Sequence, residues 1–196
     1  MSAPSIAAVV SHSVSDFDTW KKAFDGHQAA RAAAGVVGHE INRGVDDPNK
    51  LWVFLAATDR AKLEAFFASP ELKATMAQAG VTSLPEIKWL KPTEQNHVGP
   101  RATAGLIVVH EVAEYGAWKK VYDEVQPMRT AGGIIGHAVN QAADQPNNVI
   151  VYHQAETTDA LQKFVDSSQL KDAMGRAGVK SKPSFTFVQS LGLTAY

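Results

Sequence analysis

The sequence predicts an α+β fold made of two tandem copies of one module, each with the element order β-α-β-β-α-β. Two observations lead to this prediction. The segment Trp20-Lys21-Lys22 recurs as Trp118-Lys119-Lys120, and the match extends without a gap at this offset of 98 residues. Each copy also alternates between stretches with the period of strands and stretches with the period of helices. A repeat of this length predicts that each copy forms one structural unit.

The repeat includes residues that carry chemistry as well as residues that shape the backbone. The matched pairs include His12 and His110, Arg31 and Arg129, Gly38-His39 and Gly136-His137, Asn42 and Asn140, and Pro48-Asn49 and Pro146-Asn147. Between the copies, the polar segment PTEQNHVGPRAT has the proline and glycine content of a linker. We therefore expect one module over residues 1–92, a linker over 93–103 and a second module over 104–196.

The first half of each module predicts a strand followed by a helix. Residues 6–14 are rich in β-branched and apolar side chains, which favours a strand. Asp16 then offers a helix start, and Phe17, Trp20 and Phe24 follow at helical spacing. We expect Gly35 to end this helix, because glycine readily adopts the left-handed conformation that closes a helix. The second copy repeats the pattern.

The second half predicts a hairpin, two helical segments and a last strand. Residues 36–45 and 51–57 flank the cluster Asp46-Asp47-Pro48-Asn49, whose residue types form turns. Helices are expected over 59–69 and 71–79, and a strand over 87–90. This order is that of the ferredoxin-like split βαβ unit, an antiparallel sheet with its helices on one face.

Both faces of the predicted sheet carry apolar side chains. On the second hairpin strand, Trp52 and Phe54 lie on one face and Leu51, Val53 and Leu55 on the other. Because neither face suits water, we expect the two ferredoxin-like modules to pack sheet to sheet as an intramolecular pseudo-dimeric α/β barrel.

Composition narrows the class of protein and of partner. Apolar residues at 45% and charged residues at 20% exclude disordered and fibrous classes. The net charge of −1 gives no field for nucleic acid or an anionic membrane, so we expect neither as a partner and favour a small-molecule ligand. No apolar run reaches the roughly 20 residues of a membrane helix, and a charged signal region is missing, so we expect a cytoplasmic protein. Whether two chains form a homodimer stays open.

Three segments carry a resemblance to a known superfamily. They are VSHSVSDFDTWKKAFD (10–25), GVVGHEINRGVDDPN (35–49) and SPELKATMAQAGV (69–81), each echoed in the second copy. They resemble the dimeric α/β-barrel superfamily, which includes antibiotic-biosynthesis monooxygenase-like proteins, small polyketide cyclases and stress-related proteins. The resemblance implies a pocket between sheet and helices in each module, used for small and often aromatic ligands, frequently without metal or flavin.

Histidine is the main polar residue at the predicted strand positions. His12 and His110 alternate with apolar residues, so each imidazole is expected on a buried face. His39 and His137 each follow a glycine, where a ligand or another backbone can come close. A neutral imidazole can act as a general base, because its ordinary pKa lies near 6.5. These four histidines are the candidate catalytic residues, and the alternative is that they are hydrogen-bonded core histidines.

Six further residues are candidates for ligand binding: Arg31, Asn42, Trp52, Arg129, Asn140 and His153. Arginine and asparagine can orient a carboxylate, phenol or carbonyl, and the alternative for an arginine on a helix is a solvated position. Trp52 and His153 mark places where the copies differ, because their counterparts are Ile150 and Leu55. Trp20 and Trp118 fit a core stripe better than a ligand site.

The residue types also limit the chemistry. The chain has no cysteine, which excludes disulfides and thiolate metal sites. Two histidines in a module fall short of the three or four ligands that zinc needs, so we expect no metal and no cofactor. Two hypotheses remain. One is a cofactor-independent monooxygenase or cyclase acting on a small aromatic or polyketide-like substrate, which the paired histidines favour. The other is a non-catalytic ligand-binding or stress-associated protein.

Overall fold

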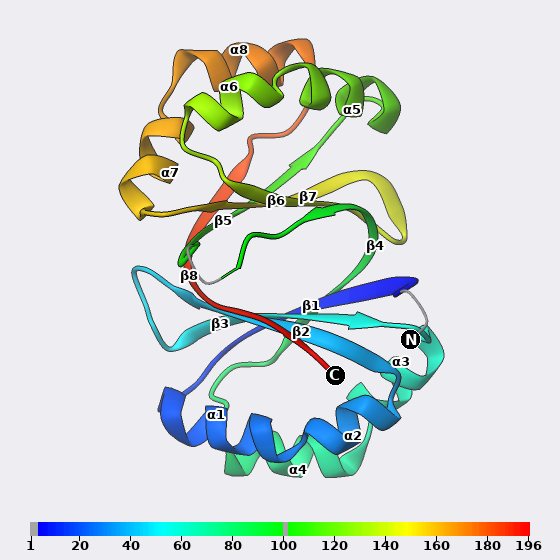
Figure 1. Cartoon of the computed structure of the whole chain (residues 1–196). Helices are drawn as coiled ribbons and strands as arrows, with labels where there is room; N and C mark the ends of the chain where they lie inside the picture. Colours follow the sequence, from blue (N-terminus) through cyan, green and yellow to red (C-terminus); the bar gives the residue numbers. More distant parts are fainter. Residues whose placement is uncertain (1–3, 100–101) are drawn as a thin grey trace. The chain divides into compact units, whose positions relative to one another are not determined.

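The computed structural model describes residues 4–99 and 102–196. Within them the chain forms eight strands and eight helices, in an order that is the same in its two halves (Figure 1). The fold divides into two compact units. Unit 1 comprises residues 1–90 together with 193–196, and unit 2 comprises residues 91–192. The α+β class predicted from the sequence is confirmed.

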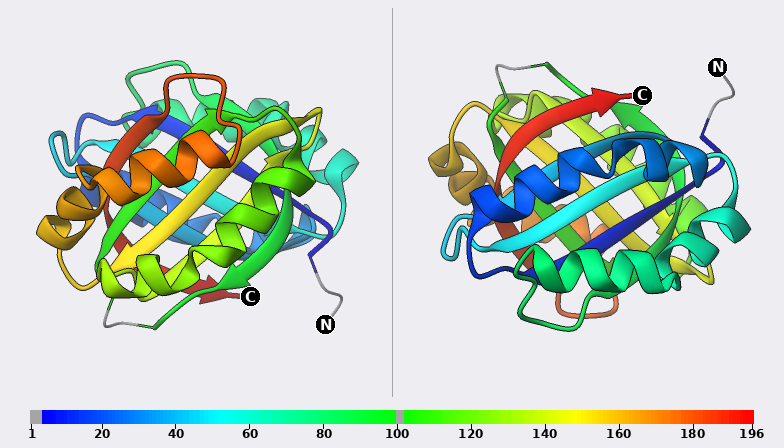
Figure 2. Two further views of the ribbon diagram at one scale, coloured as in Figure 1. Left: turned by 90° about the horizontal axis from the view of Figure 1, so that it is seen from above. Right: turned by 90° about the horizontal axis from the view of Figure 1, so that it is seen from below.

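Unit 1 has the ferredoxin-like topology. Its elements are β1 (Ile6–Ser13), α1 (Phe17–Gly26), α2 (Gln28–Ala33), β2 (Val36–Gly44), β3 (Lys50–Ala57), α3 (Arg60–Phe67), α4 (Pro70–Gln78) and the first part of β4 (Glu86–Asn96). The strands pair antiparallel in the order β4-β1-β3-β2. The helices cover one face of this sheet (Figure 2, right). This arrangement is the one expected from the β-α-β-β-α-β order.

Unit 2 repeats the topology and the register. Its elements are β5 (Ala104–Glu111), α5 (Tyr115–Glu124), α6 (Gln126–Ala131), β6 (Gly136–Ala142), β7 (Gln145–Ala155), α7 (Thr158–Val165), α8 (Ser168–Arg176) and most of β8 (Ser184–Ala195). The strand order is β8-β5-β7-β6, and the helices again cover one face (Figure 2, left). His12 is paired with Leu51, and His110 with the equivalent Val149.

The last strand of each repeat is longer than the sequence predicts. β4 continues to Asn96 within unit 2, where Thr93 Oγ1 donates a hydrogen bond of 3.0 Å to Val139 O in β6. The end of β8 belongs to unit 1, where the Tyr196 N–H donates a 3.0 Å hydrogen bond to Val37 O in β2. Residues 93–96 of the predicted linker are therefore strand, and the remaining module bounds stay a prediction.

The first helix of each repeat is broken where the sequence predicts continuity. α1 ends at Gly26 and α2 begins at Gln28, with His27 between them at φ −93° and ψ 13°. The same break occurs at Val125 in unit 2. Gly35 adopts φ +85° just after α2, which agrees with its predicted role in ending the helical segment.

The core of each unit lies between its sheet and its helices. In unit 1, Ile41, Leu51 and Val53 of the sheet pack with Trp20 and Leu63 of the helices, all of them buried. Unit 2 buries the equivalent set. In the part of the chain that the structure describes, no helix is long and apolar enough to cross a membrane.

Candidate functional site

Unit 1 contains a pocket between its sheet and its helices, with a cavity volume of about 120 Å³. Aromatic rings from α1 and α3 form much of its wall, and His12 reaches it from β1. Its lining includes Trp20, Phe24, Phe66, Phe67, Leu72, Met76 and Ile87. Ile87, which lines the pocket from β4, is 38% exposed.

His12 is the buried polar group of this pocket. Strand alternation places it on the same face as Val10 and Val14, as the sequence predicts, and it is 6% exposed. Its ring lies 5.5 Å from the Trp20 ring, and neither ring nitrogen has a hydrogen-bond partner among the described residues. Burial lowers the pKa of His12 to about 4. At neutral pH the side chain is therefore an uncharged imidazole, and the described residues leave both of its ring nitrogens without a hydrogen bond.

A second polar pair lies on the helical side of the same pocket. His27 Nε2 and Thr75 Oγ1 are 3.1 Å apart, and both residues line the cavity. His27 lies at the break between α1 and α2. The counterparts in unit 2 are Val125 and Ala173, so this pair is specific to unit 1.

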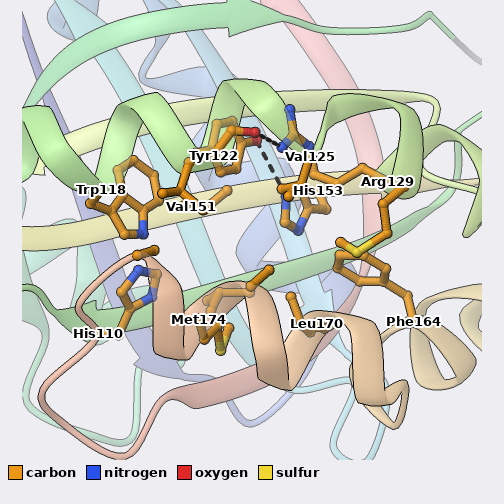
Figure 3. Close-up of a pocket in the computed structure, with 15 residues that line it drawn as sticks. His110, Trp118, Tyr122, Val125, Arg129, Val151, His153, Phe164, Leu170 and Met174 are labelled. Atoms are coloured by element: carbon orange, nitrogen blue, oxygen red, sulfur yellow. Dashed lines mark hydrogen bonds between the residues drawn. The ribbon is translucent and has the colours of Figure 1, made fainter.

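Unit 2 contains the equivalent pocket, with a smaller volume of about 50 Å³ (Figure 3). His110 is 4% exposed, lies 5.6 Å from the Trp118 ring and has no partner for either ring nitrogen among the described residues. Burial lowers its pKa to about 4. His153 faces Tyr122, whose hydroxyl is 3.4 Å from His153 Nε2. Burial, and then repulsion by Arg129, lower the pKa of His153 to about 3.

Arg31 and Arg129 line the pockets but already have structural partners. Each guanidinium lies over an aromatic ring, Phe24 for Arg31 and Tyr122 for Arg129, with 3.6 Å to each ring centroid. Each also donates a hydrogen bond to the backbone carbonyl of that same aromatic residue. These carbonyls lie in the last turn of α1 and α5, where the helix dipole favours a cation. The buried positions, 3% and 4% exposed, differ from the solvated alternative considered for a helical arginine.

His39 and His137 lie on the helical face of the sheet but do not line either pocket. The His39 ring makes edge contacts with Phe24 at 4.9 Å and with Tyr196 at 5.5 Å between centroids. Burial, and then repulsion by Arg31, lower its pKa to about 4. His137 Nε2 is 2.6 Å from Glu94 Oε1. The structure therefore does not bring two of the four predicted catalytic histidines together in one pocket, although His110 shares its pocket with the predicted ligand-binding residue His153.

Three predicted ligand-binding residues lie on the face of the sheet away from the helices. Asn42 is buried and is paired with Trp52 across β2 and β3, while the neighbouring Ile41 and Val53 belong to the helix-side core. Asn140 occupies the equivalent position in unit 2. Because strand neighbours alternate between faces, none of these three side chains lines the helix-side pockets.

Several residues of the site were missed by the sequence reasoning. They are His27, Thr75, Tyr122, Tyr196 and Glu94. His27 and Tyr122 continue the helical stripe of Trp20 and Trp118, so the stripe itself held a signal for them. Tyr196 and Glu94 reach their partners through the strand ends of β8 and β4, and no local pattern predicts that pairing.

The arrangement in unit 1 suits a planar, mostly apolar molecule with one hydrogen-bonding group. The aromatic wall can contact the faces and edges of a ring, and His12 can donate or accept one hydrogen bond inside the cavity. Among residues 4–99 and 102–196, no group of three or more His, Asp or Glu side chains is placed to hold a metal ion.

Comparison with known proteins establishes the fold. No family model matches the sequence, and no curated protein shows significant sequence similarity. Among solved structures, a protein from Fusobacterium nucleatum provisionally described as a monooxygenase is 12% identical, with a TM-score of 0.69 over 100% of this chain and 96% of its own. A similarly described protein from Lactobacillus acidophilus is 12% identical, with a TM-score of 0.66 over 99% and 97%. An anthrone oxidase-like protein is 17% identical, with a TM-score of 0.66 over 97% and 92%. The chain therefore shares the fold of these proteins.

Proposed function

We propose that the chain binds a small aromatic substrate between sheet and helices and oxidises it with dioxygen as a cofactor-independent monooxygenase. The observation that carries the proposal is His12, a buried neutral imidazole with both ring nitrogens unpartnered among the described residues, inside an aromatic pocket. A buried polar group without a partner costs free energy, so such groups are rare unless a ligand or water satisfies them.

The low pKa of His12 is compatible with a role as proton acceptor. The imidazole is uncharged at neutral pH, so it can accept a proton from an acidic group of a bound substrate. The anion that forms in this apolar pocket stabilises the imidazolium beside it, which raises the pKa of His12 in the complex. The same pairing of charges stabilises the anion.

The proposed reaction takes place at an acidic C–H group of the substrate. His12 accepts the proton, and the carbanion adds to dioxygen with formation of one C–O bond. The peroxide takes the proton back as a hydroperoxide, and loss of water leaves a carbonyl. The carbon is oxidised, and the two atoms of dioxygen end in the carbonyl and in water. The comparison with an anthrone oxidase-like protein makes anthrone a reasonable first substrate, with one ring enclosed and the remainder towards Ile87.

The test is oxygen uptake with anthrone, measured with an electrode while absorbance follows the quinone. We expect uptake and product in equal amounts, and a loss of both in His12→Ala. Adding imidazole should restore part of the activity of His12→Ala, because the free base can occupy the space left by the side chain. Restoration distinguishes proton transfer from a purely structural role. Wild-type protein that leaves the uncatalysed rate unchanged would contradict the proposed reaction.

A cyclase would use the same proton transfer without consuming dioxygen, so substrate loss without oxygen uptake would indicate that reaction class. A second candidate function is binding without turnover. It is favoured by the structural partners of Arg31 and His39, which explain both residues without a reaction. Under that alternative, His12→Ala weakens binding of the aromatic molecule and no variant affects oxygen uptake.

A further inference from the structure

We propose that only unit 1 binds the aromatic ligand, and that side chains at two positions of α5 and α6, Val121 and Met128, close the pocket of unit 2. This inference rests on the proposed binding site and adds which of the two copies is used and which residues decide it. The inference concerns which pocket binds the ligand and not the reaction, so it can be tested by binding experiments without measuring turnover.

The first support is the available space. A cavity of about 150 Å³ can hold one benzene ring. The pocket of unit 1, at about 120 Å³, approaches this size. The pocket of unit 2, at about 50 Å³, is too small for a ring. Protein interiors resist expansion because they are close-packed, so the difference should decide occupancy.

The second support is the identity of the side chains that differ. Val121 and Met128 both line the pocket of unit 2. Their counterparts at the same repeat positions in unit 1 are Ala23 and Ala30. Both exchanges add side-chain volume in unit 2 on the helical side of the cavity. The exchange of Leu55 for His153 adds little volume, but it gives Tyr122 a polar neighbour within the unit.

The third support is the distribution of polar groups. In unit 1, His12 and the His27–Thr75 pair face the cavity from opposite sides, sheet and helices. In unit 2, His153 and Tyr122 contact each other, as Figure 3 shows, with rings 6.2 Å apart and 6° from parallel. Both units thus have one bonded polar pair. The pair of unit 1 lies on the helical side alone, whereas that of unit 2 joins His153 of β7 to Tyr122 of α5, so a ligand between sheet and helices would have to separate only the pair of unit 2.

The first experiment is a crystal of the whole chain soaked with 4-bromophenol, because anomalous scattering locates each bromine atom directly. We expect one bromine site beside His12 and Trp20. In the Val121→Ala, Met128→Ala double variant we expect a second site beside His110 and Trp118. Bromine in unit 2 of the wild-type protein would overturn the proposal, and so would a double variant that still binds only in unit 1.

The second experiment measures binding in solution by the ¹⁹F signal of 4-fluorophenol. The reciprocal double variant, Ala23→Val with Ala30→Met, should weaken binding by at least about tenfold, which is the change in affinity that about 1.4 kcal/mol produces. Circular dichroism checks that each variant is folded. Equal affinity of wild-type and reciprocal variant would contradict the assignment to unit 1. If neither phenol binds to any variant, the proposed binding site itself fails, whereas binding without oxygen uptake contradicts only the proposed reaction.

Discussion

The two units keep the same backbone and use it for different side-chain contacts. Strand order agrees, and the register agrees at pairs such as His12 with Leu51 and His110 with Val149, although the hairpin irregularity follows Val36 in unit 1 and Gln141 in unit 2. The pocket walls have diverged instead, with Phe24 replaced by Tyr122 and Leu55 by His153. Backbone pairing depends on many residues at once, whereas one pocket residue can change alone. The comparison therefore shows that the fold requires the strand pairing, whereas the side chains of the pocket can change.

The same contrast extends to the edges of the sheets. In unit 1, Arg31 Nε donates to the Tyr196 hydroxyl at the end of β8. In unit 2, Glu94 from the end of β4 contacts both His137 and Lys119, at 2.6 and 2.8 Å. In unit 1, the buried Arg31 thus has the aromatic residue Tyr196 as its partner. In unit 2, Glu94 belongs to a partly exposed network of polar side chains.

The largest expected effect is on turnover. His12→Phe should lower the rate of oxygen uptake by about 10²-fold or more, the range over which general bases contribute. The phenyl ring preserves the contact with Trp20, so stability should change less than activity. The matched His110→Phe variant measures the share of unit 2, and we expect a far smaller loss. Equal losses in the two variants would contradict the assignment of the reaction to unit 1.

The next effect is acid destabilisation through the buried histidines. The pKa values of His12, His39 and His110 are lowered to about 4, and that of His153 to about 3, below the ordinary 6.5. The unfolded chain therefore binds protons that the folded chain does not. The free energy of unfolding should be constant above pH 6.5 and should fall as the pH drops from there towards 4. Each histidine contributes a slope of about 1.4 kcal/mol per pH unit.

Urea unfolding followed by tryptophan fluorescence, repeated across this pH range, measures the slope. The unit 2 variant His153→Leu installs the residue that unit 1 has at this position, so it should flatten the profile by the contribution of one histidine. The other three buried histidines should account for the pH dependence that remains in this variant. A profile that His153→Leu leaves unchanged would show that His153 is not neutral in the folded protein.

A smaller effect is expected at the edge of unit 1. Tyr196→Phe removes the hydroxyl that accepts from Arg31 while the ring against His39 remains. Hydrogen bonds to charged groups contribute about 1.5–3 kcal/mol, so the free energy of unfolding should fall by an amount in this range. Chemical denaturation of the variant at neutral pH provides the measurement. No change in stability would indicate that Arg31 finds another acceptor.

The smallest effect is expected at the edge of unit 2. Glu94→Gln removes the charge that Lys119 and His137 contact, but the carboxylate side chain is 35% exposed. Water and salt screen such pairs, so we expect a loss below about 1 kcal/mol that shrinks further in high salt. Denaturation at low and high ionic strength measures both points. A loss larger than that of Tyr196→Phe would reverse the contrast between the two edges.

The sequence predicts the topology well because it repeats and because its periods are clear. Two copies of one pattern give two observations of every element, and the alternation around His12 and His110 correctly predicts buried positions. What the pattern does not predict is which face of the sheet carries the helices. Both faces are apolar, so Asn42 and Trp52 were expected near the ligand although they lie on the face opposite to the pocket.

The remaining differences arise from contacts distant in sequence. The extension of β4 depends on β6, and the polar composition of residues 93–96 resembles a linker when read alone. The break at His27 also has a non-local aspect. His27 Nε2 lies 3.1 Å from Thr75 Oγ1, 48 positions along the chain, and helical spacing does not reveal this contact. Local periodicity predicts where helices and strands occur, whereas contacts with other parts of the unit decide where they end.

The edge of unit 1 has a consequence for folding kinetics. The hydrogen bond between Arg31 and Tyr196 joins residues 165 positions apart, although most of unit 1 is formed by the first 90 residues of the chain. Closing so long a loop lowers the conformational entropy of the chain before the stabilising contact forms, and such non-local contacts slow folding. During synthesis, unit 1 can form its core early but must wait for residue 196 to complete its edge. The last stage of its folding is thereby coupled to the synthesis of the entire second repeat.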